Sequence, residues 1–257
     1  MSAPQRLRSA DAAERLAAMA DMVTPGAGAD GEMLDALAAC LGDARKIIQR
    51  RAAETFAALD ARGIRVRDVL LRTLESDEAR QRWGAAYALS LLGDTPPVTL
   101  PTLLEALGSD DGDVRWAAGN ILARLRGDAA VPDALQHLLR TGNPAQRKMA
   151  AYCLRDLDAR SPAVERALFA ALDDPDTNVR LAAISCLGRL AVDRAMAARC
   201  LVDLLADPHV SVQRVAAAVL GPLGERSAAV RAALTTASQS GDPSLARAAE
   251  RSLRLLA

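Results

Sequence analysis

A 33-residue internal repeat is the feature of this sequence that most constrains its fold. The unit is an Asp-rich turn followed by V-R-x-A-A-x-x-x-L-x-x-L, and residues 110–128, 173–193 and 206–225 show it most clearly. When the copies are aligned on the second-to-last Leu, successive copies lie 32 or 33 residues apart. The aligned positions are Phe56, Leu89, Leu122, Leu154, Leu187, Leu220 and Leu253. A constant step over seven copies predicts a repeat architecture.

Each copy is predicted to hold two helices. In the third copy, the second helix has an apolar face formed by Val114, Ala118, Ile121, Leu122 and Leu125, and a polar face with Arg115, Trp116, Asn120 and Arg124. Its first helix is expected over residues 100–107. Capping side chains before a proline predict helix starts at Asn143, Ser161, Asp174, Asp207 and Asp242, and helix ends are expected at Gly63, Gly93 and Gly127. No segment alternates with period two, so no sheet is expected.

Helix pairs of this length cannot bury a core alone and must stack. Aromatic residues make up only 2% of the chain, while hydrophobic residues make up 51%, so the core must be built from Ala, Leu and Val. The sequence therefore predicts an all-α solenoid of about seven two-helix repeats. Residues 1–30 are expected to form an N-terminal capping helix (over 9–22) and a loop, and residues 31–257 a single continuous repeat domain.

The unit D-P-x-x-x-V-R-x-A-A-x-x-A-L-G-x-L-G resembles HEAT repeats, and specifically the HEAT-like repeats of phycobilisome lyases, over residues 31–257. This resemblance implies a right-handed α-α superhelix (a HEAT-like solenoid). It also implies that the second helices line a concave surface, along which a repeated Asp and Arg form a ladder. The Arg position, named here the ladder position, holds Arg82, Arg115, Arg147 and Arg180, and in the other copies Gln49, Gln213 and Ala246. The ladder is therefore expected to be intact centrally and broken towards both ends.

Few residues suggest enzymatic chemistry. His137 and His209 lack partners at metal-ligand spacing and are interpreted as solvent-facing side chains. Deoxyhypusine hydroxylases are HEAT-like and bind iron through repeated His-Glu pairs, and this sequence contains no such dipeptide. Cys153 and Cys186 hold equivalent positions beside core leucines, where a thiol behaves as a small hydrophobe. We therefore expect no enzymatic activity, no cofactor and no metal.

Charge and targeting signals point to an ordinary cytoplasmic protein. The chain has 32 Lys and Arg against 32 Asp and Glu, which disfavours a globally basic nucleic-acid binder. Charged residues interrupt the first 24 positions, so no signal peptide is recognised, and no apolar run approaches the length of a membrane span. In that compartment the four cysteines are expected to be reduced.

The aromatic residues mark one face of three consecutive second helices. Trp83 and Trp116 hold equivalent positions, and Tyr87 and Tyr152 hold another. The predicted groove surface consists of Arg82, Trp83, Tyr87, Arg115, Trp116, Asn120, Arg147, Lys148, Tyr152 and Arg180. The large rings either fill gaps between helices or anchor a partner, since Trp, Tyr and Arg are the residues that most often anchor interfaces.

The favoured function is a non-enzymatic scaffold or adaptor that binds a protein partner, either a peptide or an acidic surface, in this groove. One alternative is a nucleic-acid-binding protein similar to HEAT-like alkylpurine DNA glycosylases. Those enzymes need a carboxylate in the groove, whereas the positions four residues after the tryptophans hold Tyr87 and Asn120. Another is an accessory bilin lyase or chaperone. The C-terminal helix lacks an obviously polar outer face, which suggests docking into a larger assembly.

Overall fold

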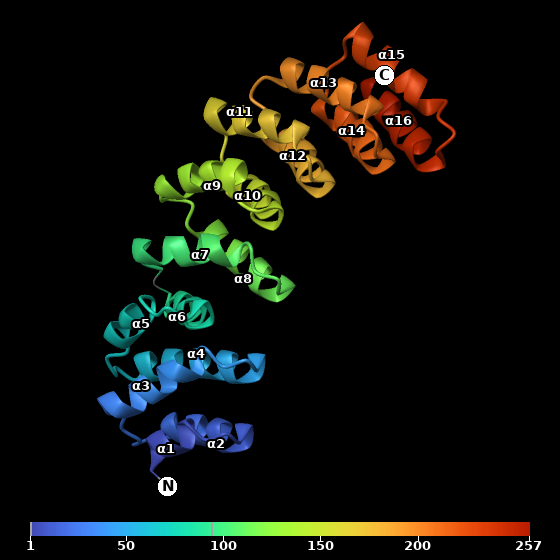
Figure 1. Cartoon of the computed structure of the whole chain (residues 1–257). Helices are drawn as coiled ribbons and strands as arrows, with labels where there is room; N and C mark the ends of the chain where they lie inside the picture. The colour runs from blue at the N-terminus through green and yellow to red at the C-terminus, as the bar shows by residue number, and fades with distance from the viewer. Residues whose placement is uncertain (1, 94) are drawn as a thin grey trace. The chain divides into compact units, whose positions relative to one another are not determined.

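The computed structural model describes residues 2–93 and 95–257. These residues form sixteen α-helices and three 3-10 helices, and no strand occurs among them (Figure 1). In chain order, the first and second helices of the seven predicted repeats are α3 (Gly31–Cys40) and α4 (Lys46–Ala61), α5 (Arg67–Thr73) and α6 (Ala79–Leu91), α7 (Leu100–Ala106) and α8 (Gly112–Arg124), α9 (Ala130–Thr141) and α10 (Pro144–Asp156), α11 (Pro162–Ala170) and α12 (Thr177–Leu190), α13 (Arg194–Asp203) and α14 (Val210–Leu223), and α15 (Ala228–Ser238) and α16 (Pro243–Leu256).

The helices group into two compact units, residues 1–106 (unit 1) and 107–257 (unit 2). In unit 1, α4 packs on α6. In unit 2, the second helices α8, α10, α12, α14 and α16 pack on one another in series and form the inner side of that unit, while α9, α11, α13 and α15 form its outer side (Figure 1). The single continuous domain expected for residues 31–257 stays a prediction.

Two helices precede the first repeat. The helix predicted over 9–22 is confirmed as α2 (Ala12–Met22), and the Asp11 carboxylate accepts the Ala13 amide at its start, at 2.9 Å. A short helix that the sequence did not reveal, α1 (Ala3–Leu7), contacts α2 and α3. Leu7 is buried, and its carbonyl accepts the Cys40 thiol at 3.3 Å. Since α2 packs on α4, these helices cover the apolar end of the first pair.

The buried core is formed by the positions that recur in every repeat. Six of the seven aligned positions are buried, and the seventh, Leu253, is half-buried. The small residues allow the second helices to approach closely. At Gly221 in α14, an added Cβ would lie 2.6 Å from the Cα of Ser252 in α16, so only glycine allows this approach. The Ser252 hydroxyl uses the same contact to donate to the Ala217 carbonyl, at 2.6 Å.

Three of the five predicted helix starts are confirmed. Asn143, Ser161 and Asp242 each accept a backbone N–H at the start of a helix whose first residue is proline. The starts predicted at Asp174 and Asp207 are wrong. There α12 and α14 begin three residues later, because both aspartates instead follow short 3-10 helices, η2 (Ala171–Asp173) and η3 (Leu204–Ala206). A third 3-10 helix, η1 (Pro97–Thr99), precedes α7.

Two of the three predicted glycine ends are also confirmed. Gly63 and Gly93 follow α4 and α6 with φ of +81° and +76°, the left-handed conformation that glycine adopts without strain. The end predicted at Gly127 is wrong, because α8 stops at Arg124 and Leu125 caps it.

Candidate functional site

The side chains at the ladder position bind the turn that precedes their own helix. Six of the seven, all but Ala246, donate a hydrogen bond to a backbone carbonyl five or six residues earlier. The bonds are Gln49 to Asp43 (2.6 Å), Arg82 to Ser76 (2.8 Å), Arg115 to Ser109, Arg147 to Gly142 (2.9 Å), Arg180 to Asp174 (2.8 Å) and Gln213 to Asp207 (2.7 Å). A glutamine amide reaches the same carbonyl as a guanidinium does. The hydrogen bond to the preceding turn is therefore also present at Gln49 and Gln213, where the ladder was expected to break.

Only two of the four arginines at the ladder position bind an aspartate 27 residues later, whereas the sequence predicted an intact ladder at all four. In unit 2, Arg147 binds the Asp174 carboxylate through two bonds of 2.7 and 2.8 Å, and Arg180 binds Asp207 through two of 2.9 and 3.1 Å. The turns that follow Arg82 and Arg115 place Ser109 and Gly142 at that point, and neither has a carboxylate. The expectation of an intact central ladder is therefore wrong in this respect.

Two further partners complete the ladder in unit 1. Arg82 binds the Glu105 carboxylate of α7 at 2.8 Å. Arg15 of α2 pairs with Asp43, a residue pair that the sequence analysis missed. Arg15 lies 34 residues before Gln49, one more than the repeat step, so the step alone does not assign it to the ladder position.

The pair Arg180–Asp207 is buried, with 7% of Arg180 and 8% of Asp207 exposed. Burial acts to raise the pKa of Asp207, but the His209 amide and the Arg180 guanidinium outweigh it, and the pKa lies below its ordinary value. The pKa of Asp174 is lowered in the same way, with Arg147 as the main bonding partner. Each of these ion pairs joins two consecutive repeats. Because the guanidinium N–H groups of Arg147 and Arg180 already bind within the fold, few of them remain to bind a partner.

The aromatic residues of the predicted groove surface fall in both units. In unit 1, Trp83 and Tyr87 stack on each other along α6, with ring centroids 5.7 Å apart. In unit 2, Tyr152 of α10 is half-buried, and the Arg155 guanidinium lies 4.9 Å from its ring centre. Trp116 of α8 is different, because 71% of it is exposed, more than any other large hydrophobic side chain in the described ranges.

The structure places the remaining predicted residues of this surface on neighbouring helices of unit 2. Asn120 is exposed on α8, and Lys148 is half-exposed on α10 at the position equivalent to Trp116. Because α8 and α10 pack together, Trp116, Asn120, Lys148 and Tyr152 lie on two adjacent second helices. This part of the predicted groove surface is named the Trp116 face.

The remaining titratable residues lie at exposed or structural positions. His137 and His209 are exposed, as expected. The Glu165 carboxylate is buried but accepts the amides of Val192 and Asp193 at 2.8 and 2.9 Å, which is a structural role. Within residues 2–93 and 95–257, no group of three His, Cys, Asp or Glu side chains could hold a metal ion. In the same ranges, no helix has both the length and the apolar character needed to span a membrane.

All four cysteines are free, and three of them are buried. Burial raises the pKa of Cys153 and of Cys186 to about 12, and that of Cys40 to about 11. The Cys186 thiol also donates to the Ala151 carbonyl at 3.1 Å. These thiols therefore belong to the core, as the sequence suggested.

This burial predicts the order in which the thiols react with a disulfide reagent such as DTNB. We expect Cys200, the half-exposed one, to react first at pH 8, and Cys153 and Cys186 only as the protein unfolds, because the attacking species is the thiolate. Absorbance of the released thiolate gives the count, and a Cys200→Ser variant identifies the fast group. Rapid release of more than one equivalent from folded wild type, or of a full equivalent from the folded variant, would contradict the prediction.

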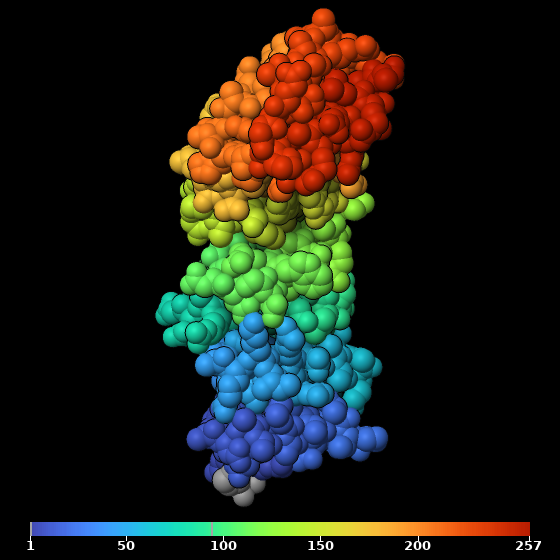
Figure 2. Space-filling model, turned by 90° about the vertical axis from the view of Figure 1, so that its right-hand side faces the viewer, coloured from blue at the N-terminus to red at the C-terminus, as the bar shows by residue number. Residues whose placement is uncertain are grey.

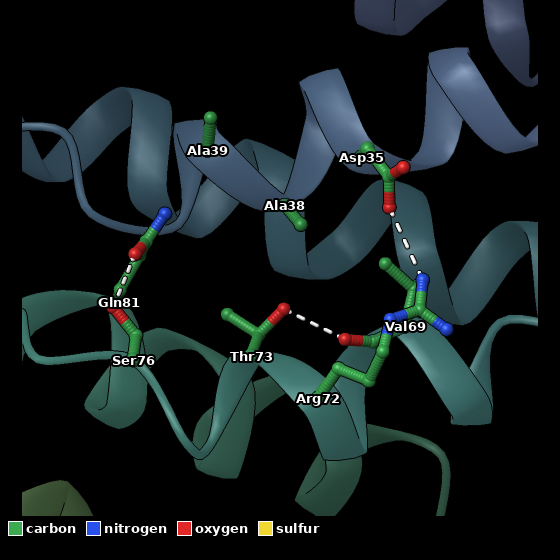
Figure 3. A pocket seen from close by; sticks show the side chains of 8 residues that line it. All are labelled: Asp35, Ala38, Ala39, Val69, Arg72, Thr73, Ser76 and Gln81. Atoms are coloured by element: carbon green, nitrogen blue, oxygen red, sulfur yellow. Dashed lines mark hydrogen bonds and ion pairs between the residues drawn. The ribbon is translucent and has the colours of Figure 1, made fainter.

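A cavity of ≈ 250 Å³ lies between the first helices α3 and α5 in unit 1 (Figure 3). Its polar groups bind one another. Arg72 pairs with Asp35 at 3.2 Å, the Thr73 hydroxyl donates to the Val69 carbonyl, and Ser76 donates to the Gln81 side chain. A cavity whose donors and acceptors are already matched is a packing gap, and we do not assign a ligand to it.

Stacked helix pairs with a repeated side-chain ladder define the class of α-helical repeat proteins. Within that class, the sequence matches HEAT repeats over residues 34–123, 100–166 and 165–254, and the chain belongs to this family. The predicted α-α superhelical fold class and the HEAT resemblance are confirmed. The narrower likeness to phycobilisome lyases stays a prediction. A search of curated protein sequences gave no match.

Solved structures with the same fold support this assignment. YibA of Escherichia coli is 19% identical, with a TM-score of 0.56, over 98% of this chain and 91% of its own. An engineered protein is 21% identical, with a TM-score of 0.53, over 99% and 77%. Kap95p, solved in complex with RanGDP, is 15% identical, with a TM-score of 0.64, over 99% of this chain and 40% of its own. At these identities the likeness shows the fold alone.

Proposed function

We propose that this protein is a non-enzymatic scaffold that binds a partner protein on the exposed face of its second helices, with Trp116 as the principal anchor. Membership of the HEAT repeats supports a binding role, and Kap95p, which has a similar fold, is known in complex with the protein RanGDP. A cytoplasmic location and docking of the C-terminal repeat into a larger assembly belong to the same proposal. Leu255, 54% exposed on α16, supports the docking.

The exposure of Trp116 is the observation that carries the proposal. An exposed tryptophan leaves a large apolar area in water. A partner that covers this ring buries that area, which favours binding, and the rigid side chain loses little conformational entropy. Packing within the fold accounts in part for the position of the Tyr152 ring, because the ring contacts Arg155 of the same helix. No such contact covers Trp116 to a comparable degree.

The residues of the predicted groove surface take different roles in the proposal. Trp116, Asn120, Lys148 and Tyr152 are proposed to contact a partner in unit 2, and Trp83 and Tyr87 in unit 1. Four arginines, Arg82, Arg115, Arg147 and Arg180, donate to their own turns, and they are proposed to hold the second helices in register. In this proposal, these four arginines therefore contribute less to partner binding than the Trp116 face does.

The proposal predicts that Trp116→Ala/Lys148→Ala loses a protein partner. Wild type and variant serve as bait in native lysate, and retained proteins are quantified by mass spectrometry after circular dichroism shows equal helicity. A central anchor is worth about 2 kcal/mol, or roughly thirtyfold in Kd, so the specific partner should fall to near background. The matched control is Met196→Ala/Arg199→Ala, an exposed apolar and basic pair on the first helix α13.

Identical retained proteins for wild type and the Trp116 variant would overturn the proposal, as would an equal loss in the α13 control. Retention of single-stranded DNA that depends on Trp116 would instead favour the nucleic-acid alternative, because bases stack on exposed aromatic rings.

A further inference from the structure

Three arginines surround a pocket at the C-terminal end of the second-helix series. Arg214 of α14 and Arg247 and Arg251 of α16 line a cavity of ≈ 280 Å³, together with Val215, Ala218 and Ala248. Figure 2 shows the side of unit 2 on which these helices lie, with α14 in orange and α16 in red. The cavity has an apolar floor between three cationic side chains.

The repeat register brings these arginines together. Arg214 and Arg247 lie 33 residues apart and hold the position that Trp116 holds in α8, and Arg251 lies 33 residues after Ala218. Equivalent positions of neighbouring repeats lie side by side, and α14 and α16 approach each other closely at Gly221. Arg247 and Arg251 are also four residues apart on one helix, so they share a face.

No carboxylate among the described residues forms an ion pair with Arg214, Arg247 or Arg251. All three side chains are exposed, and the only side-chain hydrogen bond of the cluster within residues 2–93 and 95–257 is a long one of 3.5 Å, from Arg247 to the Ser244 hydroxyl. Like charges on one face repel each other. This cluster therefore differs from the ladder arginines, which bind turns and carboxylates, and an anionic ligand would relieve its repulsion.

We infer that this pocket, the Arg214 pocket, binds an acidic protein segment in which an apolar side chain is flanked by carboxylates. The apolar side chain would cover Val215, Ala218 and Ala248, and the guanidinium groups would bind the flanking carboxylates in pairs of parallel hydrogen bonds. The cavity of ≈ 280 Å³ has room for one apolar side chain.

Nucleic acid fits the pocket less well than an acidic segment. Single strands bind where aromatic rings alternate with cations, and neither α14 nor α16 contains an aromatic residue. The formal net charge of the chain is zero, so no net positive charge of the whole chain adds to the three local charges.

This inference names the chemistry of a partner segment and therefore rests on the proposed function, but it uses different residues. If the Trp116 variant binds the acidic probe and the pocket variant does not, the inference holds whatever the lysate experiment shows. If the Trp116 partner is confirmed while the probe fails to bind, only the inference about the Arg214 pocket is lost.

The test uses fluorescence anisotropy of a labelled hexapeptide, Asp-Glu-Leu-Glu-Asp-Glu, titrated with the full chain to about 1 mM. The variant is Arg214→Gln/Arg247→Gln/Arg251→Gln. The charge-matched control is Arg140→Gln/Arg166→Gln/Arg199→Gln, which removes three exposed arginines from the first helices α9, α11 and α13. We expect the pocket variant to bind the peptide at least about tenfold more weakly, and the control to stay within about twofold of wild type.

Two further probes test the ligand chemistry. Asn-Gln-Leu-Gln-Asn-Gln lacks the carboxylates, and Asp-Glu-Ser-Glu-Asp-Glu lacks the apolar side chain, so both should bind more weakly. No binding of the acidic peptide by wild type would overturn the inference, and so would equal losses in the two arginine variants. Tighter binding of labelled oligothymidylate than of the peptide, lost in the pocket variant, would assign the pocket to nucleic acid instead.

Discussion

Replacing Asp207 by Ala is expected to lower the free energy of unfolding by about 3–5 kcal/mol, the largest effect of a single substitution in the ladder. Arg180 is 7% exposed, and the variant removes the carboxylate that pairs with its guanidinium. It also removes the acceptor of the His209 amide, at 2.8 Å. Urea unfolding followed by circular dichroism measures the change.

Asp203→Ala is the matched control, since this aspartate is exposed on α13 nearby, and it should change stability by no more than about 0.5 kcal/mol. Stability in a repeat array is a sum over repeats and their interfaces, so the loss should be local. Amide hydrogen exchange should therefore speed up most in α12 and α14. Equal effects of the two substitutions would show that the buried pair contributes no more than a surface charge.

The same pair predicts a loss of stability in acid. The pKa of Asp207 in the folded protein lies below its ordinary value of 3.8, so the folded state favours the ionised form. This contribution is complete above that ordinary value and disappears as the pH falls through the lower pKa of the folded state. The stability difference between wild type and Asp207→Ala should therefore shrink below about pH 4. A difference that stays constant from pH 6 to pH 2 would contradict this account.

The second large effect is expected at Phe56, a fully buried side chain of α4. Phe56→Ala removes a large side chain and leaves a cavity, and it should cost about 3–5 kcal/mol. The other six copies carry Leu at this position, so Phe56→Leu should recover most of the loss. Trp116→Ala, by contrast, should stay within about 0.5 kcal/mol, because most of its ring is already in water.

This comparison separates the two interpretations of the aromatic residues. A cost for Trp116→Ala close to that for Phe56→Ala would show that the tryptophan fills a gap between helices, and would remove the main support for the Trp116 face. A stable variant that has lost its partner would assign the ring to binding.

The sequence by itself determined the helix pairs, their order and their buried positions. A 33-residue step repeats the same apolar positions, and packing of those positions needs only a periodic pattern and small side chains. Six aligned positions are accordingly buried, and the starts at Asn143, Ser161 and Asp242 were predicted from local cap chemistry. The helix starts depend on residues close in the chain, and the buried positions depend on an apolar pattern that recurs in many repeats.

Only the tertiary structure decided which polar side chains meet. Asp174 and Asp207 look like helix caps in the sequence, but each binds an arginine 27 residues earlier, because stacking places that turn beside the preceding second helix. Arg15 reaches Asp43 for the same reason, and Arg214 meets Arg247 and Arg251 only because α14 and α16 lie in contact. Contacts between repeats depend on which single residue occupies each turn, and the periodic pattern carries no information about that choice.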